Sequence, residues 1–108
     1  MTYQELFEKA RTLLARADAS AIGEHLAFEF RITGEAAGTF YLEVQNGQLS
    51  IQPYDYKDHD AAFTCSAETL FKLAEGKTDP VAAVMLGRLR VEDNIDKALK
   101  LKQLIGKK

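Results

Sequence analysis

Residues 76–104 read GKTDPVAAVMLGRLRVEDNIDKALKLKQL and contain the boundaries of several short elements. Gly76 ends a helix, because glycine adopts the left-handed backbone conformation of a helix C-terminus at no steric cost. Asp79-Pro80 begins the next helix, since aspartate accepts free backbone N–H groups and proline is tolerated at the first helical position. Gly87 ends that helix in turn. This order of signals predicts two short helices in close succession.

The second half of the stretch predicts a strand and a last helix. Leu89 and Val91 alternate with charged residues, which is the period-two pattern of a half-buried strand over Arg88–Glu92. An Asp-Asn pair then caps a helix over Asn94–Ile105. The apolar side of that helix consists of Ile95, Ala98, Leu99, Leu101, Leu104 and Ile105.

Upstream, the apolar spacing predicts a helix, a meander of three strands, a fourth strand and another helix. The expected ranges are Thr2–Ala17 for the helix, Leu26–Thr33, Phe40–Gln45, Leu49–Ile51 and Ala61–Ser66 for the strands, and Ala67–Glu75 and Pro80–Leu86 for the next two helices. Asn46-Gly47 predicts a two-residue hairpin turn. The order indicates an α+β fold with a five-stranded sheet, and helices cover its one apolar face.

Composition limits the class of protein. The chain has 108 residues, so we expect one domain over residues 1–108. The net charge is −2, which argues against a general nucleic-acid binder. Met1–Ala17 is charged throughout and does not read as a secretory signal, and no apolar run is long enough to cross a bilayer. Cys65 is the single cysteine, which excludes an internal disulfide and favours a cytoplasmic location.

The pattern resembles the SCP-2 sterol carrier family over nearly the whole chain. The shared features are an aspartate before a strand (Asp60), a serine-capped helix (Ser66), the run Gly-Lys-Thr-Asp-Pro at 76–80, and Gly-Arg-Leu-Arg-Val at 87–91. The chain departs from the family at Asp93-Asn94, where the family has Gly-Asp. An Asp or Asn side chain tolerates a left-handed turn, so the fold prediction stands.

The resemblance implies an apolar tunnel between sheet and helices that binds a sterol, fatty acid, fatty acyl-CoA or phospholipid. It implies a non-catalytic carrier of such a lipid ligand, with no cofactor and no metal. The candidate tunnel residues are Phe28, Phe30, Phe40, Leu42, Leu49, Ile51, Phe63, Leu70, Leu73, Val84, Met85, Leu89, Leu99 and Leu104. The alternative for these residues is an ordinary packed core.

A second hypothesis for function keeps the fold and changes the role. The same domain could lack a bound lipid and serve oligomerisation, or act as an accessory subunit of an enzyme that handles lipophilic intermediates. A carrier needs an apolar cavity, and a filled module does not. The sequence leaves the ligand and the oligomeric state open.

Three further features have a structural and a functional interpretation. The loop Tyr54–Asp60 holds three aspartates and His59, but its spacing matches no calcium loop, so a solvated turn is favoured over a metal or catalytic site. Cys65 is in phase with Phe63 and is expected in the core. The C-terminal lysines complement a helix dipole, or contact an anionic membrane surface transiently. They are Lys97, Lys100, Lys102, Lys107 and Lys108.

Overall fold

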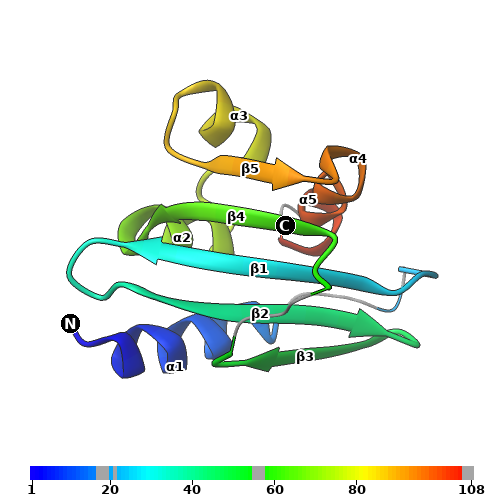
Figure 1. Ribbon diagram of the computed structural model, residues 1–108, viewed down its shortest axis with the longest axis horizontal. Helices are drawn as coiled ribbons and strands as arrows, with labels where there is room; N and C mark the ends of the chain where they lie inside the picture. Colours follow the sequence, from blue (N-terminus) through cyan, green and yellow to red (C-terminus); the bar gives the residue numbers. More distant parts are fainter. Residues whose placement is uncertain (17–19, 21, 55–57, 106–108) are drawn as a thin grey trace.

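Five strands form one mixed sheet in the order β3–β2–β1–β4–β5 in the computed structural model, which describes residues 1–16, 20, 22–54 and 58–105 (Figure 1). β1 pairs antiparallel with β2 and parallel with β4, while the β2–β3 and β4–β5 pairs are antiparallel. The strands are β1 Leu26–Thr33, β2 Gly38–Gln45, β3 Gln48–Gln52, β4 Ala61–Ser66 and β5 Arg90–Asp93. This confirms the expected five-stranded α+β fold.

The β2–β3 connection is the hairpin that Asn46-Gly47 predicts. Both residues have positive φ, 55° for Asn46 and 74° for Gly47, as a type I′ turn requires. The turn pairs Val44 with Leu49 and Leu42 with Ile51. The alternating apolar residues of β2 and β3 therefore lie on the same face of the sheet.

A row of phenylalanines crosses the middle of that face. Phe30 of β1 lies opposite Phe40 of β2 and opposite Phe63 of β4. The ring of Phe30 stacks on both neighbours, with centroids 5.1 Å from Phe40 and 5.2 Å from Phe63. The rings of Phe28 and Phe63 pack edge to face, with centroids 5.2 Å apart. The strand register thus fills the centre of the sheet with aromatic rings.

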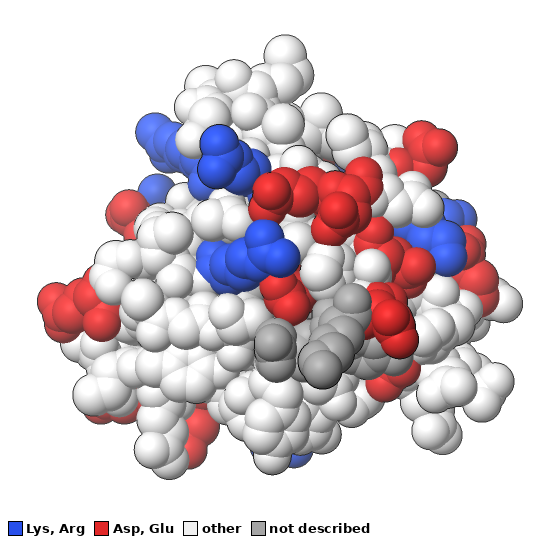
Figure 2. Space-filling view, in the orientation of Figure 1, with Lys and Arg blue, Asp and Glu red and all other residues white. Residues whose placement is uncertain are grey.

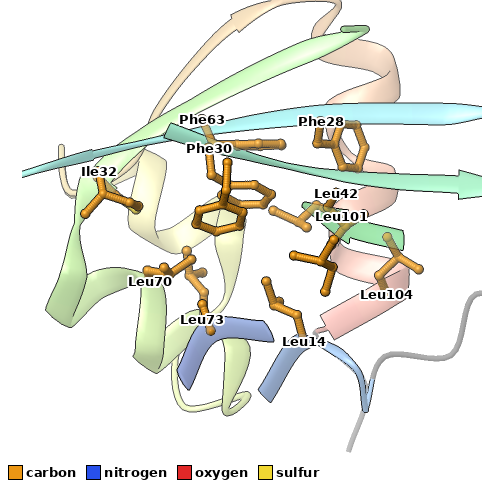
Figure 3. Packing of buried hydrophobic residues seen from close by; sticks show 14 of the residues in the cluster. Leu14, Phe28, Phe30, Ile32, Leu42, Phe63, Leu70, Leu73, Leu101 and Leu104 are labelled. Carbon is orange, nitrogen blue, oxygen red and sulfur yellow. The ribbon is translucent and has the colours of Figure 1, made fainter. Parts of the chain in front are cut away.

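Helices cover this aromatic face. α1, α2 and α5 send leucines against the phenylalanines, as Figure 3 shows for Leu14, Leu73 and Leu101. All three leucines are 1% exposed or less. The helices are α1 Tyr3–Leu14, α2 Ala67–Ala74, α3 Pro80–Met85, α4 Ile95–Ala98 and α5 Lys100–Ile105.

Asp60 ties the start of β4 to three other parts of the chain. Its N–H donates to the carbonyl of Ala27 (2.7 Å), and the N–H of Ala27 donates to its carboxylate (2.9 Å). Its carbonyl accepts from the N–H of Asn94 (2.9 Å), and the ammonium of Lys97 reaches its carboxylate at 3.2 Å. Asp60 therefore connects the start of β4 to β1, to the β5–α4 turn and to α4.

Most observed boundaries differ from the expected ones by one to three residues, and two differences affect the C-terminal part. The last strand begins at Arg90, because the N–H groups of Arg88 and Leu89 both donate to the carbonyl of Ala83 instead of pairing with β4. The last helix divides at Leu99, whose carbonyl accepts from the N–H of Lys102 in a tighter, three-residue step. Asp93 has φ 72°, so the left-handed turn anticipated at Asp93-Asn94 is present.

Core and surface leucines should differ in what they contribute to stability. Leu73 is 1% exposed in the core, and Leu99 is 56% exposed. We expect Leu73→Ala to lower the free energy of unfolding by about 2–5 kcal/mol, because it removes buried methyl groups and leaves a cavity. The matched change Leu99→Ala should cost less than about 1 kcal/mol. Urea denaturation measures both, and equal losses would contradict the assigned packing.

Candidate functional site

An apolar pocket of about 230 Å³ lies where α3, β5, α4 and α5 meet. One wall comes from α3, through Pro80, Val81, Val84 and Met85. The spacing i, i+1, i+4, i+5 places these side chains on one side of the short helix. This pocket is smaller than the roughly 300–1,000 Å³ of sites that enclose a whole drug-sized ligand.

The signals at both ends of α3 hold it beside β5. The N–H of Ala82 donates to the carboxylate of Asp79 (3.1 Å), which caps the helix start. Gly87, with φ 75°, reverses the chain after the helix. The carbonyl of Ala83 then accepts from the N–H groups of Arg88 (2.9 Å) and Leu89 (3.2 Å). The turn after α3 therefore leads directly into β5.

The opposite wall comes from α4 and α5. Ile95, Ala98, Leu99 and Lys102 follow the i, i+3, i+4, i+7 spacing of one helix face, and all four line the pocket. The ammonium of Lys102 lies 3.4 Å from the carboxylate of Asp79, so an ion pair joins the two walls. The N–H of Ala82 and this lysine hold the pKa of Asp79 below its ordinary value.

The floor is continuous with the core. Phe63, Leu89 and Val91 form it. Phe63 is 1% exposed, and it lies opposite Val91 in the β4–β5 pair. Because the ring of Phe63 also stacks on Phe30, the pocket ends where the phenylalanine row begins.

The pocket is open, and its rim is apolar and solvent-exposed. Val81, Val84, Met85, Ile95 and Leu99 are each at least 40% exposed, and Met85 is 82% exposed. Figure 2 shows the uncharged surface of α3 at the top of the molecule, above the charged face of the sheet. Exposed apolar residues gathered around one cleft are typical of a site that binds an apolar ligand or a partner surface.

Comparison with known proteins agrees with this architecture. Residues 5–106 match the SCP-2 sterol transfer family. The chain belongs to this family. Sterol carrier protein 2 of Bos taurus is 31% identical over 80 residues, which are 71% of this chain and 15% of the relative. Hydroxysteroid dehydrogenase-like protein 2 of Rattus norvegicus is 29% identical over 79 residues, 72% of this chain and 15% of the relative. The chain thus corresponds to about one seventh of these curated relatives.

Solved structures share the SCP-2 fold. Palmitated SCP2L2 of Aedes aegypti has a TM-score of 0.69 at 17% identity, and the match covers 99% of this chain and 96% of that one. The sec-alkylsulfatase Pisa1 of Pseudomonas sp. has a TM-score of 0.73 at 20% identity, over 88% of this chain and 15% of the sulfatase. The ubiquinone synthesis protein UbiJ-SCP2 has a TM-score of 0.63 at 18% identity, over 92% of this chain and 90% of that one.

Within this SCP-2 domain the predicted tunnel residues fall into two groups. Five of them line the pocket: Phe63, Val84, Met85, Leu89 and Leu99. The other nine pack in or against the core cluster: Phe28, Phe30, Phe40, Leu42, Leu49, Ile51, Leu70, Leu73 and Leu104. Phe30 stacks on Phe40, Phe28 packs against Phe63, and helix leucines cover these rings, so the centre of the sheet is filled (Figure 3).

Sequence reasoning did not assign six further residues to the ligand site. These complete the pocket lining and are Pro80, Val81, Val91, Ile95, Ala98 and Lys102. The apolar side predicted for Asn94–Ile105 divides in two. Ile95 and Leu99 face the pocket, while Leu101 and Leu104 are at most 2% exposed in the core. The helical spacing of Ile95, Ala98, Leu99 and Lys102 indicates that they share one face of the helix. Spacing does not reveal whether such a face packs in the core or lines an open pocket.

The other candidate groups take structural roles. Lys97 pairs with Asp60, and the ammonium of Lys100 lies 3.5 Å from the carboxylate of Glu24. Lys107 and Lys108 lie outside the described residues. The His59 ring bonds the carboxylate of Asp93 at 2.7 Å.

Of the Tyr54–Asp60 loop, residues 55–57 lie outside the described part, and none of its described residues lines the apolar pocket. Within the described residues, no group of three or more His, Cys, Asp or Glu side chains could hold a metal ion. In the same part of the chain, no helix has the length and hydropathy to cross a membrane.

Cys65 should be unreactive in the folded protein. Its side chain is buried, and burial raises the pKa of the thiol to about 12. The reactive thiolate is therefore scarce at pH 8, and we expect alkylation by iodoacetamide at least about a thousand-fold slower than in urea-unfolded protein. Because the chain has a single cysteine, mass spectrometry reads the rate directly. Similar rates in both states would contradict the assigned burial.

Proposed function

We propose that this domain binds an apolar ligand reversibly, with an acyl chain or a sterol edge held in the pocket between α3 and α4–α5, and transfers it without covalent chemistry. The observation that carries the proposal is the pocket itself, with its apolar walls and exposed apolar rim. The relationship to sterol carrier protein 2 supports a lipid as the ligand class. A free, buried Cys65 is consistent with a reducing, cytoplasmic location.

The driving force would be burial of hydrocarbon. Each methylene group removed from water contributes about 0.8 kcal/mol to the binding free energy, so burial of a few ligand carbons strengthens binding measurably. Met85 on the rim is unbranched and adapts to ligands of different shape. A smooth apolar wall separates neighbouring chain lengths weakly, so selectivity for length should be low.

A long ligand needs more room than 230 Å³, and α3 is the wall that can yield. The helix has six residues, of which Pro80 and Ala83 are buried. Two polar interactions connect α3 to the rest of the domain. They are the hydrogen bonds that the carbonyl of Ala83 accepts and the surface ion pair between Asp79 and Lys102. Outward movement of α3 would lengthen the pocket without disturbing the phenylalanine row. The described residues that line the pocket include no serine, threonine, cysteine or carboxylate, and the ammonium of Lys102 is ion-paired with Asp79, which supports a non-catalytic role.

A wall variant tests the pocket directly. Leu99 lines the pocket and is 56% exposed, so Leu99→Glu should fold normally. We expect it to weaken binding of a fluorescent fatty acid by about ten-fold or more, because a carboxylate replaces an apolar contact. The matched control is Leu86→Glu, since Leu86 is 67% exposed and lies next to α3 without lining the pocket. Equal affinity of wild type and Leu99→Glu would place the ligand elsewhere.

A second function is favoured by the filled centre of the sheet. The domain could carry no lipid and use the apolar rim to form oligomers or to support an enzyme that acts on lipophilic intermediates. The fold shared with UbiJ-SCP2 makes an accessory role worth testing. Native mass spectrometry of the purified protein separates the two functions. A carrier should retain a lipid or take up added fatty acid as a monomer, whereas a ligand-free oligomer would favour the accessory role.

A further inference from the structure

The end of α3 exposes more apolar surface than the pocket requires. Met85 and Leu86 are 82% and 67% exposed, and they are consecutive at the C-terminus of the helix. Leu86 does not line the pocket, so the ligand site does not explain it. Two large apolar side chains that project from a helix end into water indicate a contact surface.

Two arginines follow immediately in the sequence. Arg88 and Arg90 are exposed, and neither has an ion pair or hydrogen bond to a side chain within the described residues. The other basic side chains of this end differ, since Lys102 pairs with Asp79 and Lys97 with Asp60. Figure 2 shows the blue side chains over the start of β5, directly below the uncharged surface of α3.

The alternation of side chains over residues 88–91, where the chain enters β5, explains this arrangement. Leu89 and Val91 point into the apolar pocket, while Arg88 and Arg90 line a separate polar hollow of about 720 Å³ on the other side of the strand. The hydroxyl residues Ser66 and Thr69 line the same hollow. Guanidinium and hydroxyl groups are donors that suit phosphate oxygens.

We infer that the α3–β5 corner, meaning Met85, Leu86, Arg88 and Arg90, docks on the surface of an anionic lipid bilayer. Met85 and Leu86 enter the interfacial region, and the two arginines contact lipid phosphates. The occupant is a bilayer because apolar and phosphate-binding groups lie side by side on one exposed corner. The inference rests on the proposed function, because docking there places the pocket rim beside the membrane that supplies the ligand.

The net charge of −2 does not oppose this contact. Charges beyond about 8 Å are largely screened at physiological ionic strength, so the nearest residues decide the interaction. Glu92 lies farther along β5 and is engaged by Arg31 at 2.8 Å. Glu68 lines the same hollow as the two arginines, and its carboxylate lies 3.8 Å from the ammonium of Lys72. Among the described residues, the nearest charges at the corner without an ion pair are therefore positive.

Co-sedimentation of ligand-free protein with vesicles tests the inference. The probes are vesicles of phosphatidylcholine alone and vesicles with added phosphatidylglycerol. We expect preferential binding to the anionic vesicles, weakened by added salt. Arg88→Gln with Arg90→Gln should reduce that binding by about thirty-fold, and Met85→Ser with Leu86→Ser should also reduce it. The matched control is Arg11→Gln with Arg16→Gln, which removes the same charge from exposed arginines at the α1 end, with an expected change below about three-fold.

Three results would overturn the docking surface. They are no binding of wild type to either vesicle, equal binding of the wild type and the Arg88/Arg90 variant, or loss of binding in the Arg11/Arg16 control. A protein that ignores vesicles but self-associates through Met85 and Leu86 would indicate a protein partner instead. Titration of a fluorescent fatty acid without vesicles is a separate readout. The Arg88/Arg90 variant should bind that probe as wild type does, so failure of docking is distinguishable from failure of the pocket.

Discussion

The placement of β4, of the β5–α4 turn and of α4 depends on the contacts of Asp60. This residue pairs its backbone and its carboxylate with Ala27, and so sets the parallel alignment of β4 on β1. Its carbonyl holds the N–H of Asn94 where β5 turns into α4. An aspartate suits this position because its two carboxylate oxygens can accept separate donors, here a backbone N–H and an ammonium group. The α4 wall of the pocket is therefore positioned through Asp60 by the central strands.

The core and the pocket both lie on the apolar face of the sheet. Toward β1 and β2 the phenylalanine row is covered by leucines of α1, α2 and α5 and is fully packed. Toward β5 the cover consists of α3 and α4, which are short and leave an open apolar pocket between them. Close packing at one end gives stability, while incomplete cover at the other leaves space for a ligand.

The short β5 strand separates apolar from charged surroundings. Along residues 88–91, where the chain enters β5, alternate side chains face the pocket on one side and a polar hollow on the other. A ligand with an apolar body and an anionic head would find both environments within one strand width. This amphipathic strand links the proposed carrier function to the proposed contact with a bilayer.

Local signals in the sequence determined the elements and the fold. The caps at Ser66 and Asp79, the Asn46-Gly47 turn and the period-two strands act over a few residues, and all appear in the structure. The apolar face of the sheet was also predictable, because it follows from alternation. Only the tertiary structure decided which apolar residues are buried in the core and which line the open pocket. Phe28 and Leu99 are both apolar at regular spacing, yet one is buried by distant helices and the other lines an open pocket. Burial depends on contacts between segments far apart in the chain, and periodicity does not encode them.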